Sequence, residues 1–350
     1  MLKTISLGVI GGGQLGSLLC SAAKKLKVKT VVLSDDKEGP AQHFCDKFIY
    51  SKYDDNEKVR EFISKVDIVT YEFENIPVDF LNLINREKKV LPSPKINKIA
   101  QNRKLEKTFV NELGIITTDW VLIESADDIK KNQHLLPGIL KSNTLGYDGK
   151  GQFVLNSLDD VKQDWCFTKD YILEKKVDLK KEISVIIARY ADGTMTNYEP
   201  IENVHQNQIL YKSKIPADIS NKIFKSAVKN AKKIAENFLY VGILTIEYFI
   251  NKKDELLVNE IAPRFHNSGH LTIEAFNISQ FENHVRAVCS LQQIPIKKIS
   301  DAEMLNIIGK QIIAFREKPK LESNQFLFDY LKKEIKEKRK MGHLTTLKKC

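Results

Sequence analysis

The stretch Asn259–His270 is rich in side chains that bind charged or polar ligands. It reads N-E-I-A-P-R-F-H-N-S-G-H and follows the apolar run Leu256–Val258, which has the pattern of a buried strand. Burying a carboxylate, an arginine, histidines and amides together costs free energy unless something polar is bound there. We therefore predict that this stretch forms the floor of an active site.

Two carboxylates, Glu247 and Glu260, indicate a cation site. They lie in two β-patterned runs, 241–250 and 255–261, and the polar turn between the runs predicts an antiparallel hairpin. Carboxylates on neighbouring strands repel each other unless a cation bridges them. Oxygen ligands favour Mg²⁺ shared with nucleotide phosphates over zinc or a redox metal. The alternative is a cross-strand pair that nearby lysines neutralise.

A glycine-rich loop follows the strand expected at 136–141. It reads G-Y-D-G-K-G-Q over residues 146–152. Glycine lets the backbone approach phosphates closely, and lysine meets their charge. We predict a phosphate-binding loop here, although a glycine hairpin without a ligand has the same pattern.

Another glycine turn, at residues 11–16, lies near the start of the chain. It follows the β-branched run 4–10 and precedes a helical pattern. The next expected strand is 29–33, and Asp35 follows it closely. Strand, glycine turn and helix, with an acidic residue about twenty positions further on, match a dinucleotide-binding fingerprint. The motif alone would favour an oxidoreductase, but such a turn suits any phosphate.

The remaining pattern predicts an α/β chain whose first part, to about residue 100, is a parallel doubly wound sheet. Tyr71–Asn75 follows the strand at 66–70 and places carboxylates at the sheet edge where ligands bind, although an ordinary acidic loop is an equal alternative. Other strands are expected at 48–50, 171–177 and 182–189, and helices at 55–65, 94–113 and 218–239.

Composition favours a soluble protein of two or three domains, with 42% hydrophobic and 29% charged residues over a length of 350. No apolar run is long enough to span a bilayer, and glycines 11–13 interrupt any secretory signal. The formal charge of +10 is spread along the chain, with a local excess at 332–340, so we expect neither a nucleic-acid nor a membrane partner. The cysteines are scattered, without C-x-x-C spacing, and indicate reduced cytosolic thiols. They are Cys20, Cys45, Cys166, Cys289 and Cys350.

Several of these segments together resemble the ATP-grasp ligases, and among them the ATP-dependent carboxylases of purine biosynthesis. The resemblance extends over nearly the whole chain, to Arg339–His343. It implies an ATP-grasp fold with a Rossmann-like N-terminal domain at 1–100, an ATP-grasp domain at 101–290 with a small lobe at about 115–180, and a small β-rich C-terminal domain at 291–350. The matching segments are Gly11–Gly16, Tyr71–Asn75, Lys141, Gly146–Gln152, Glu174–Val177, Glu247 and Asn259–His270.

The resemblance also implies a reaction. ATP would phosphorylate bicarbonate to carboxyphosphate, with Mg²⁺ as the metal. The carboxyl group, or CO₂ released from it, would pass to the exocyclic amine of 5-aminoimidazole ribonucleotide, giving its N5-carboxy derivative, ADP and phosphate. The resemblance further implies a cytoplasmic homodimer whose partners are these small molecules.

Site residues follow from the same resemblance, with Glu247 and Glu260 as the metal ligands. ATP would be held by Arg103, Lys141, Gly146, Tyr147, Asp148, Gly149, Lys150, Gly151, Gln152, Glu174, Lys175, Lys176, Val177, Glu182, His205, Asn259 and Glu260. Bicarbonate and carboxyphosphate would be held by Arg264, His266 and Asn267, with Ser268 and His270 completing the pocket. The ribonucleotide would be held by Gln14, Glu72, Tyr147, Asp148, Lys150, Lys332, Arg339 and Lys340.

Three positions depart from the pattern of this group. Phe265 stands where a second proline is usual, Leu331 where glycine is usual, and Lys150 where arginine is common. A lysine supplies a point charge without the bidentate fork of arginine. Three alternatives remain: a dehydrogenase that binds NAD at the first glycine turn, a nucleotide-binding module without turnover, and a sister ligase that uses formate or another carboxylate.

Overall fold

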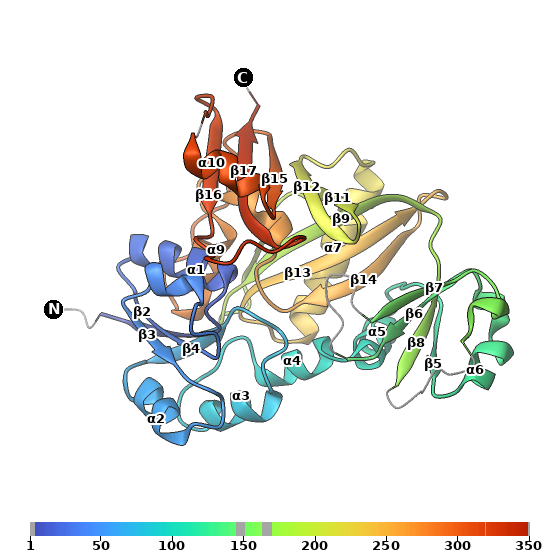
Figure 1. The fold of residues 1–350 in the computed structure, drawn as a ribbon, viewed down its shortest axis with the longest axis horizontal. Coiled ribbons are helices and arrows are strands. Elements are labelled where there is room, and N and C mark those ends of the chain that lie inside the picture. The colour runs from blue at the N-terminus through green and yellow to red at the C-terminus, as the bar shows by residue number, and fades with distance from the viewer. Residues whose placement is uncertain (1–3, 145–150, 163–169, 319, 349–350) are drawn as a thin grey trace.

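The structure is a computed structural model that describes residues 4–144, 151–162, 170–318 and 320–348. Figure 1 shows an N-terminal sheet in blue, a small sheet in green at the other end of the molecule, and a large sheet between them that continues into the red C-terminal strands. The three sheets have four, four and nine strands.

The N-terminal sheet is parallel, with the strand order β3-β2-β1-β4. The parallel, doubly wound domain predicted from the sequence is therefore confirmed. Its side chains alternate between two faces, and apolar residues such as Leu7 and Ile10 are fully buried. The elements are β1 (Ser6–Ile10), α1 (Gln14–Lys25), β2 (Lys29–Ser34), η1 (Pro40–His43), β3 (Lys47–Tyr50), α2 (Asn56–Ser64), β4 (Ile68–Tyr71) and α3 (Val78–Asn85).

The small sheet is antiparallel, with the order β5-β8-β6-β7. Its core contains Ile123, Leu140 and Leu173, which pack with Ile129 of α6. Two helices, α4 (Pro94–Ala100) and α5 (Arg103–Glu112), connect it to the N-terminal sheet. Its elements are β5 (Trp120–Ile123), α6 (Ala126–Lys131), η2 (Gln133–Leu135), β6 (Gly138–Ser142), β7 (Gln152–Leu155), η3 (Leu158–Asp160) and β8 (Tyr171–Lys175).

The large sheet is buried on both faces in its central strands. On β13, Ile243 packs in the core that includes α9, and the next residue, Leu244, packs in the core that includes α7. This alternation places the two helices on opposite faces. The elements are β9 (Leu179–Arg189), β10 (Met195–Asn197), β11 (Ile201–Gln206), β12 (Ile209–Ile215), α7 (Asn221–Asn237), β13 (Gly242–Asn251), β14 (Leu256–Ala262), η4 (Asn267–Leu271), α8 (Thr272–Ala275) and α9 (Gln280–Val288).

The C-terminal strands extend the large sheet instead of forming a sheet of their own. Strand β12 pairs with β15 (Ala302–Ile308), which pairs with β17 (Lys340–Leu347), which pairs with β16 (Gln325–Asp329). Helix α10 (Gln311–Glu317) lies between β15 and β16 in the chain. This continuity carries the basic segment after β16 back toward the middle of the molecule (Figure 1).

The helix predicted at 94–113 is two helices, because the side chain of Asn102 accepts a hydrogen bond from the N–H of Leu105 and begins α5. The charged residues of this segment have the pattern of a solvated helix, but the structure buries two of them. Lys107 and Glu106 are buried, since each finds a charged or polar partner in another element.

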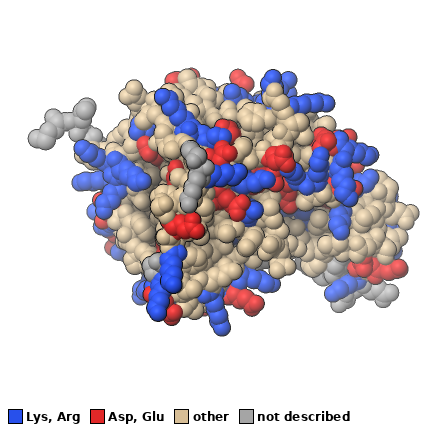
Figure 2. Space-filling view, turned by 90° about the horizontal axis from the view of Figure 1, so that it is seen from above, with Lys and Arg blue, Asp and Glu red and all other residues tan. Residues whose placement is uncertain are grey.

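The structure also gives the state of the thiols, the length of the helices and the distribution of surface charge. Cys20, Cys45 and Cys289 are free thiols. Cys166 and Cys350 lie outside the described residues. Within the described ranges, every helix is too short or too polar to cross a membrane. Figure 2 shows Lys and Arg spread over one face and interleaved with acidic side chains, as expected for a solvated surface.

Candidate active site

The carboxylate hairpin predicted from the sequence is confirmed. Strands β13 and β14 are antiparallel, and Glu247 pairs directly with Glu260, next to a bulge at Glu247/Tyr248. Burial, followed by the like charge of Glu260, raises the pKa of Glu247 to about 8. The two carboxylates therefore lie side by side on one face of the hairpin, where their like charges repel each other.

This carboxylate pair fits a divalent cation. Glu247 Oε1 is buried and accepts no hydrogen bond, so it has a free lone pair where a cation would be held. Within the described residues, no three or more His, Cys, Asp or Glu side chains form a metal cluster. Two carboxylates are nevertheless enough for Mg²⁺, which keeps several waters and uses substrate phosphates as ligands.

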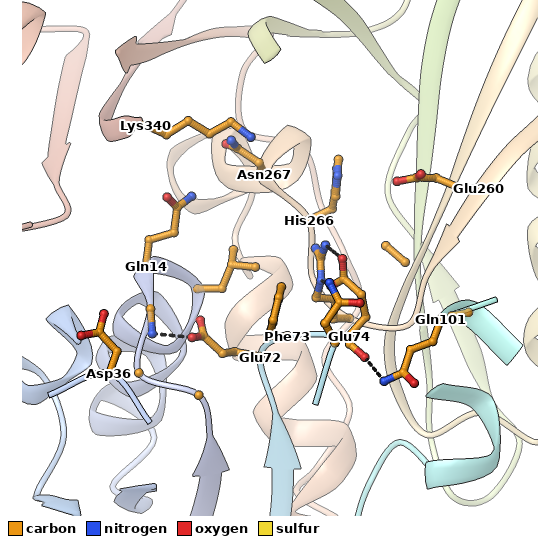
Figure 3. A pocket seen from close by; sticks show the side chains of 18 of the residues that line it. Gln14, Asp36, Glu72, Phe73, Glu74, Gln101, Glu260, His266, Asn267 and Lys340 are labelled. Atoms are coloured by element: carbon orange, nitrogen blue, oxygen red, sulfur yellow. Dashed lines mark hydrogen bonds and ion pairs between the residues drawn. The ribbon is translucent and has the colours of Figure 1, made fainter. Parts of the chain in front are cut away.

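A cavity of about 510 Å³ joins this hairpin to the N-terminal and C-terminal parts of the chain. It brings together residues that are far apart in sequence, as Figure 3 shows for Gln14, Glu72, Glu260, His266 and Lys340. The predicted site residues that line it are Gln14, Glu72, Arg103, Gln152, Glu260, Arg264, His266, Asn267, Lys332, Arg339 and Lys340.

The N–H groups of the first glycine turn bind a carboxylate of the protein itself, that of Glu72. The N–H groups of Gly13 and Gly16 both donate to the Glu72 carboxylate. Gly11 has a φ of +102°, and a Cβ there would lie 2.5 Å from Glu72 Cγ. Burial raises the pKa of Glu72, and the two N–H donors oppose that effect. Because these donors are occupied, the turn does not offer them to a dinucleotide pyrophosphate, which argues against the dehydrogenase interpretation.

Arg264 is held in a fixed orientation by Glu74. Its Nε and Nη2 both donate to the Glu74 carboxylate, the latter at 2.9 Å, and Nη1 donates to the Phe265 carbonyl at 3.0 Å. Burial opposes the charge of Arg264, but Glu74 raises its pKa. Gln101 fixes the loop in turn, because its Nε2 donates to the carbonyl of Glu74 at 2.6 Å. The sequence placed carboxylates at this edge but did not identify Glu74 as the partner of Arg264.

Asn267 is the clearest candidate for a residue that binds a polar ligand. Its side chain is buried, it lines the cavity, and neither its Oδ1 nor its Nδ2 has a hydrogen-bond partner. A buried amide without partners costs about 1–3 kcal/mol. A polar ligand in the cavity would satisfy it.

Ser268 and His270, which were expected to complete the pocket, lie behind its wall. Both are fully buried. Ser268 Oγ lies 2.9 Å from His266 Nδ1, and the His270 ring packs against His343 with a centroid distance of 4.9 Å. Burial lowers the pKa of His266 and of His270 well below its usual value, so both rings are neutral at pH 7. Ser268 and His270 are therefore placed to support the wall.

Four residues predicted from the sequence to bind ATP form two pairs. In the small sheet, Lys141 on β6 lies 3.0 Å from Glu174 on β8, counted between Nζ and Oε1. In the large sheet, His205 Nδ1 lies 2.6 Å from Glu182 Oε2. Burial opposes the protonation of His205, but Glu182 raises its pKa.

The predicted ATP residues that neither line the cavity nor form these pairs lie on or next to the strands of the two sheets, or outside the described residues. Lys175 ends β8, and Lys176 and Val177 connect it to β9. Asn259 precedes Glu260 on β14. Gly151 has a φ of +71°, where a Cβ would lie 2.5 Å from Ser142 Oγ. The predicted residues Gly146, Tyr147, Asp148, Gly149 and Lys150 lie outside the described part of the chain.

Lys107 is a buried cation near this site that the sequence did not reveal. Its Nζ lies 3.4 Å from Glu174 Oε1 and donates to Thr118 Oγ1 at 3.2 Å. Thr118 in turn donates to Glu174 Oε2 at 2.8 Å. Glu174 therefore faces two lysines, Lys107 and Lys141. Burial alone would raise the pKa of Glu174, but the two lysines lower it to about 2.

The basic C-terminal segment reaches the cavity through Lys332. Its Nζ donates to Gln14 Oε1 at 2.9 Å and to the Lys340 carbonyl at 2.7 Å, and it lies 5.2 Å from the centre of the Tyr330 ring. Leu331, immediately before it, has a φ of +55°, in the left-handed region. In the ligases that this sequence resembles, glycine is usual at this position. Glycine adopts the left-handed conformation freely.

We expect Leu331→Gly to raise the free energy of unfolding by about 0.5–1 kcal/mol. The left-handed conformation costs a leucine about 1–2 kcal/mol, and the greater freedom of glycine in the unfolded chain cancels part of the gain. Urea denaturation would measure the change. Leu321→Gly is the control, because Leu321 is similarly exposed and does not have a positive φ. A gain of the same size in both variants would contradict this explanation.

Models of three known domains match successive parts of the chain. The ribonucleotide synthetase preATP-grasp domain matches residues 2–101, the ATP-grasp domain 108–281, and the phosphoribosylaminoimidazole carboxylase C-terminal domain 302–349. The predicted fold class, an α/β ATP-grasp fold with a parallel N-terminal domain and a C-terminal domain, is thereby confirmed.

Curated relatives match over almost the full length. The N5-carboxyaminoimidazole ribonucleotide synthase of Bacillus subtilis (strain 168) is 37% identical over 98% of this chain and 91% of its own length. The enzyme of the same name from Brucella melitensis biotype 1 is 40% identical over 98% of this chain and 96% of its own length.

Solved structures agree with this assignment. An ADP complex of an N5-carboxyaminoimidazole ribonucleotide synthetase superposes with a TM-score of 0.94 at 35% identity, over 99% of this chain and 93% of that one. The Aspergillus clavatus enzyme in complex with ADP and 5-aminoimidazole ribonucleotide superposes with a TM-score of 0.89 at 29% identity, over 99% and 95%. The chain belongs to the N5-carboxyaminoimidazole ribonucleotide synthase family of ATP-grasp ligases.

Proposed function

We propose that this protein uses ATP and bicarbonate to carboxylate 5-aminoimidazole ribonucleotide in purine biosynthesis. The observation that carries the proposal is the single cavity that joins the carboxylate hairpin, the unpartnered Asn267 and the basic C-terminal segment. A nucleotide, a small anion and a phosphorylated acceptor each find side chains of suitable charge around that cavity. The domains are proposed at 1–100, 101–290 and 291–350.

The first step forms a bond between a bicarbonate oxygen and the γ-phosphorus of ATP and breaks the bond from that phosphorus to ADP. Such a transfer depends on positioning and on neutralising the phosphate charge. Glu247 and Glu260 would hold Mg²⁺, which supplies positive charge to the phosphates when bound. Arg264 would orient the bicarbonate through its remaining N–H groups, and Asn267 would bind it through an amide that has no protein partner.

In the second step, the amine nitrogen of the acceptor bonds to the activated carbon, and phosphate leaves. The acceptor must therefore extend from Asn267 toward a site for its own 5′-phosphate. Lys332, Arg339 and Lys340 line that end of the cavity. Gln14, which accepts a hydrogen bond from Lys332, lies on the same side in Figure 3. We place the acceptor along this line, with its ribose near Glu72.

The proposal also includes Mg²⁺ as the metal, a homodimer as the assembly and the cytoplasm as the location, all of which the resemblance to this group of ligases supports. Sedimentation velocity would test the assembly. A single species at twice the chain mass is expected, and a monomer at micromolar concentration would contradict it.

ADP release, measured by coupled oxidation of NADH, tests the proposed function. Each of ATP, bicarbonate and 5-aminoimidazole ribonucleotide is left out in turn, and formate replaces bicarbonate in a further reaction. We expect full turnover only with all three substrates. Equal turnover with formate would favour a sister ligase, and ATP binding without any turnover would favour a non-catalytic module.

We expect Arg264→Lys to lower turnover roughly 10²-fold while ATP affinity changes less than about twofold. Lysine keeps the charge but loses the fork that Glu74 and the bound anion share. Steady-state kinetics and ATP titration would separate the two effects. Arg286→Lys is the control, since Arg286 forms a similar pair with Glu282, at 3.0 Å, on helix α9. A loss confined to ATP affinity would contradict the role given to Arg264.

A further inference from the structure

A chain of buried side-chain hydrogen bonds leads from the large sheet to His266. Ser213 Oγ lies 2.8 Å from Asn203 Oδ1, and Asn203 Nδ2 lies 3.1 Å from Ser184 Oγ. Ser184 Oγ lies 2.8 Å from Ser268 Oγ, which lies 2.9 Å from His266 Nδ1. These bonds connect β12, β11 and β9 to the segment that carries His266.

Two N–H groups, which can only donate, set the direction of the hydrogen bonds in this series. The Asn203 amide nitrogen can only donate, so Ser184 accepts from it and keeps its own proton for Ser268. The backbone N–H of Ser268 donates to His266 Nδ1 at 3.3 Å, so this ring nitrogen must carry a lone pair. The Ser268 hydroxyl then donates to the same lone pair. Every proton in the chain therefore points toward His266.

The strand register explains why these side chains meet. Asn203 pairs with Ser213 across β11 and β12, and Ser184 on β9 pairs with Glu247 on β13. Ser184 thus lies beside Glu247 on the same face of the sheet, and Ser268 contacts it from the η4 turn. Ser184, Ser213 and Ser268 are fully buried and Asn203 nearly so, which makes a role as substrate ligands impossible for them in this arrangement.

We propose that Ser213, Asn203, Ser184 and Ser268 act as positioning residues that hold His266 in the neutral tautomer with its proton on Nε2. Its Nε2 lies 3.3 Å from Glu247 Oε1, and His266 lines the cavity. That contact is not aligned as a hydrogen bond, because Glu247 Oε1 accepts none. The Nε2–H group is therefore available to an anionic oxygen in the cavity.

This assignment deepens the proposed function, on which it rests, by giving His266 one role and removing another. As an N–H donor, His266 would stabilise negative charge on bicarbonate or on the phosphoryl group being transferred. It would not take the proton of the acceptor amine, because its only lone pair is already used by Ser268. Another group, or the departing phosphate, must accept that proton.

Nitrogen-15 NMR of the histidine side chains tests the tautomer directly. Long-range proton–nitrogen spectra of the full-length protein would be recorded with and without millimolar Mg²⁺, and the His266→Gln variant would identify the His266 signals. We expect Nδ1 to resonate as a nitrogen without a proton and Nε2 as one with a proton, in both conditions. A proton on Nδ1, or on both nitrogens, would overturn the proposal.

Substitution of a remote link tests the network. Ser184→Ala is expected to shift the His266 Nδ1 resonance and to lower turnover about tenfold, with little change in KM for ATP. Ser51→Ala is the control, because Ser51 is also buried, donates to the Lys52 carbonyl at 2.7 Å, and does not line the cavity. Should Ser184→Ala fail to fold, Ser213→Ala removes the first link instead. Unchanged His266 resonances and turnover would overturn the proposal.

The NMR result does not depend on turnover. If the protein released no ADP with 5-aminoimidazole ribonucleotide, the proposed function would fail while the tautomer could still be measured. If Nδ1 carried the proton in an enzyme that carboxylates the ribonucleotide, the function would stand and this assignment would fall.

Discussion

Glu260→Gln is expected to lower the rate of ADP release roughly 10²–10³-fold while the fold is retained. Glutamine keeps the volume of the side chain but removes the charge that faces Glu247 across the hairpin. The side chain of Glu260 is 39% exposed, so its replacement leaves no cavity in the core. Turnover measured over a range of Mg²⁺ concentrations should show a weakened metal requirement together with the lower rate.

Glu255→Gln is the matched control for this variant. Glu255 lies just before β14 on the same hairpin, is exposed, and contacts Asn251 at 2.6 Å. It should keep wild-type turnover. If Glu260→Gln also stayed within about threefold of wild type, Glu260 would not be a metal ligand and the cation site would have to lie elsewhere.

Glu174→Gln is expected to lower the free energy of unfolding by about 3–5 kcal/mol, because it leaves two buried ammonium groups without their carboxylate. Lys107 and Lys141 both contact Glu174 Oε1, and both are at least nine-tenths buried. Guanidinium denaturation would measure the loss. The variant should also bind ATP weakly, because Lys141 would lose the group that orients it.

The pH dependence of this loss has a defined direction. The pKa of Glu174 is lowered to about 2 in the folded protein. Its contribution to stability is therefore fully present at pH values above the pKa of glutamate in the unfolded chain, and it fades as pH falls toward about 2. The difference between wild type and Glu174→Gln should be constant above about pH 5 and narrow below it. Asp127→Asn is the control, since its pair with Lys130 is exposed to solvent and should contribute little to stability. Equal losses in the two variants would contradict the buried-pair explanation.

Local pattern was enough to predict the parts of the site that lie on continuous elements. The apolar runs on either side of the turn at 251–254 predicted the hairpin. The observed register of its two strands pairs Glu247 with Glu260. The glycine turn at 11–16 and the strand before Glu72 were also predicted. These features depend on neighbouring residues in the sequence, where periodicity and turn chemistry are informative.

Features that need a distant partner were not predicted. Lys107 and Glu106 belong to a helix whose charges are typical of a solvated face. Their burial is explained by Glu174 and Thr118, which contact Lys107, and by the N–H of Ile261, which donates to Glu106. Arg264 was expected to bind bicarbonate, yet Glu74, in the loop after β4 of the N-terminal sheet, occupies much of its guanidinium. A one-dimensional pattern gives the polarity of a side chain but not the group that it meets across a domain boundary.

The N-terminal fingerprint shows the same limit. Its glycines match the turn of a dinucleotide-binding domain. Here, however, the N–H groups of the turn bind Glu72, a residue that follows a different strand in the sequence. Once the sheet forms, parallel strands β1 and β4 lie side by side, and the carboxylate enters the turn. The motif is thus used to fix the cavity wall and not to bind a pyrophosphate.

Oxygen-18 transfer tests the central claim, which is that ATP phosphorylates bicarbonate in this cavity. The enzyme would be given oxygen-18 bicarbonate, ATP and 5-aminoimidazole ribonucleotide, and the inorganic phosphate would be analysed by mass spectrometry. We predict that the phosphate carries a single bicarbonate oxygen, since that oxygen stays on phosphorus when the carboxyl group leaves. Phosphate free of the label during sustained carboxylation would contradict the account.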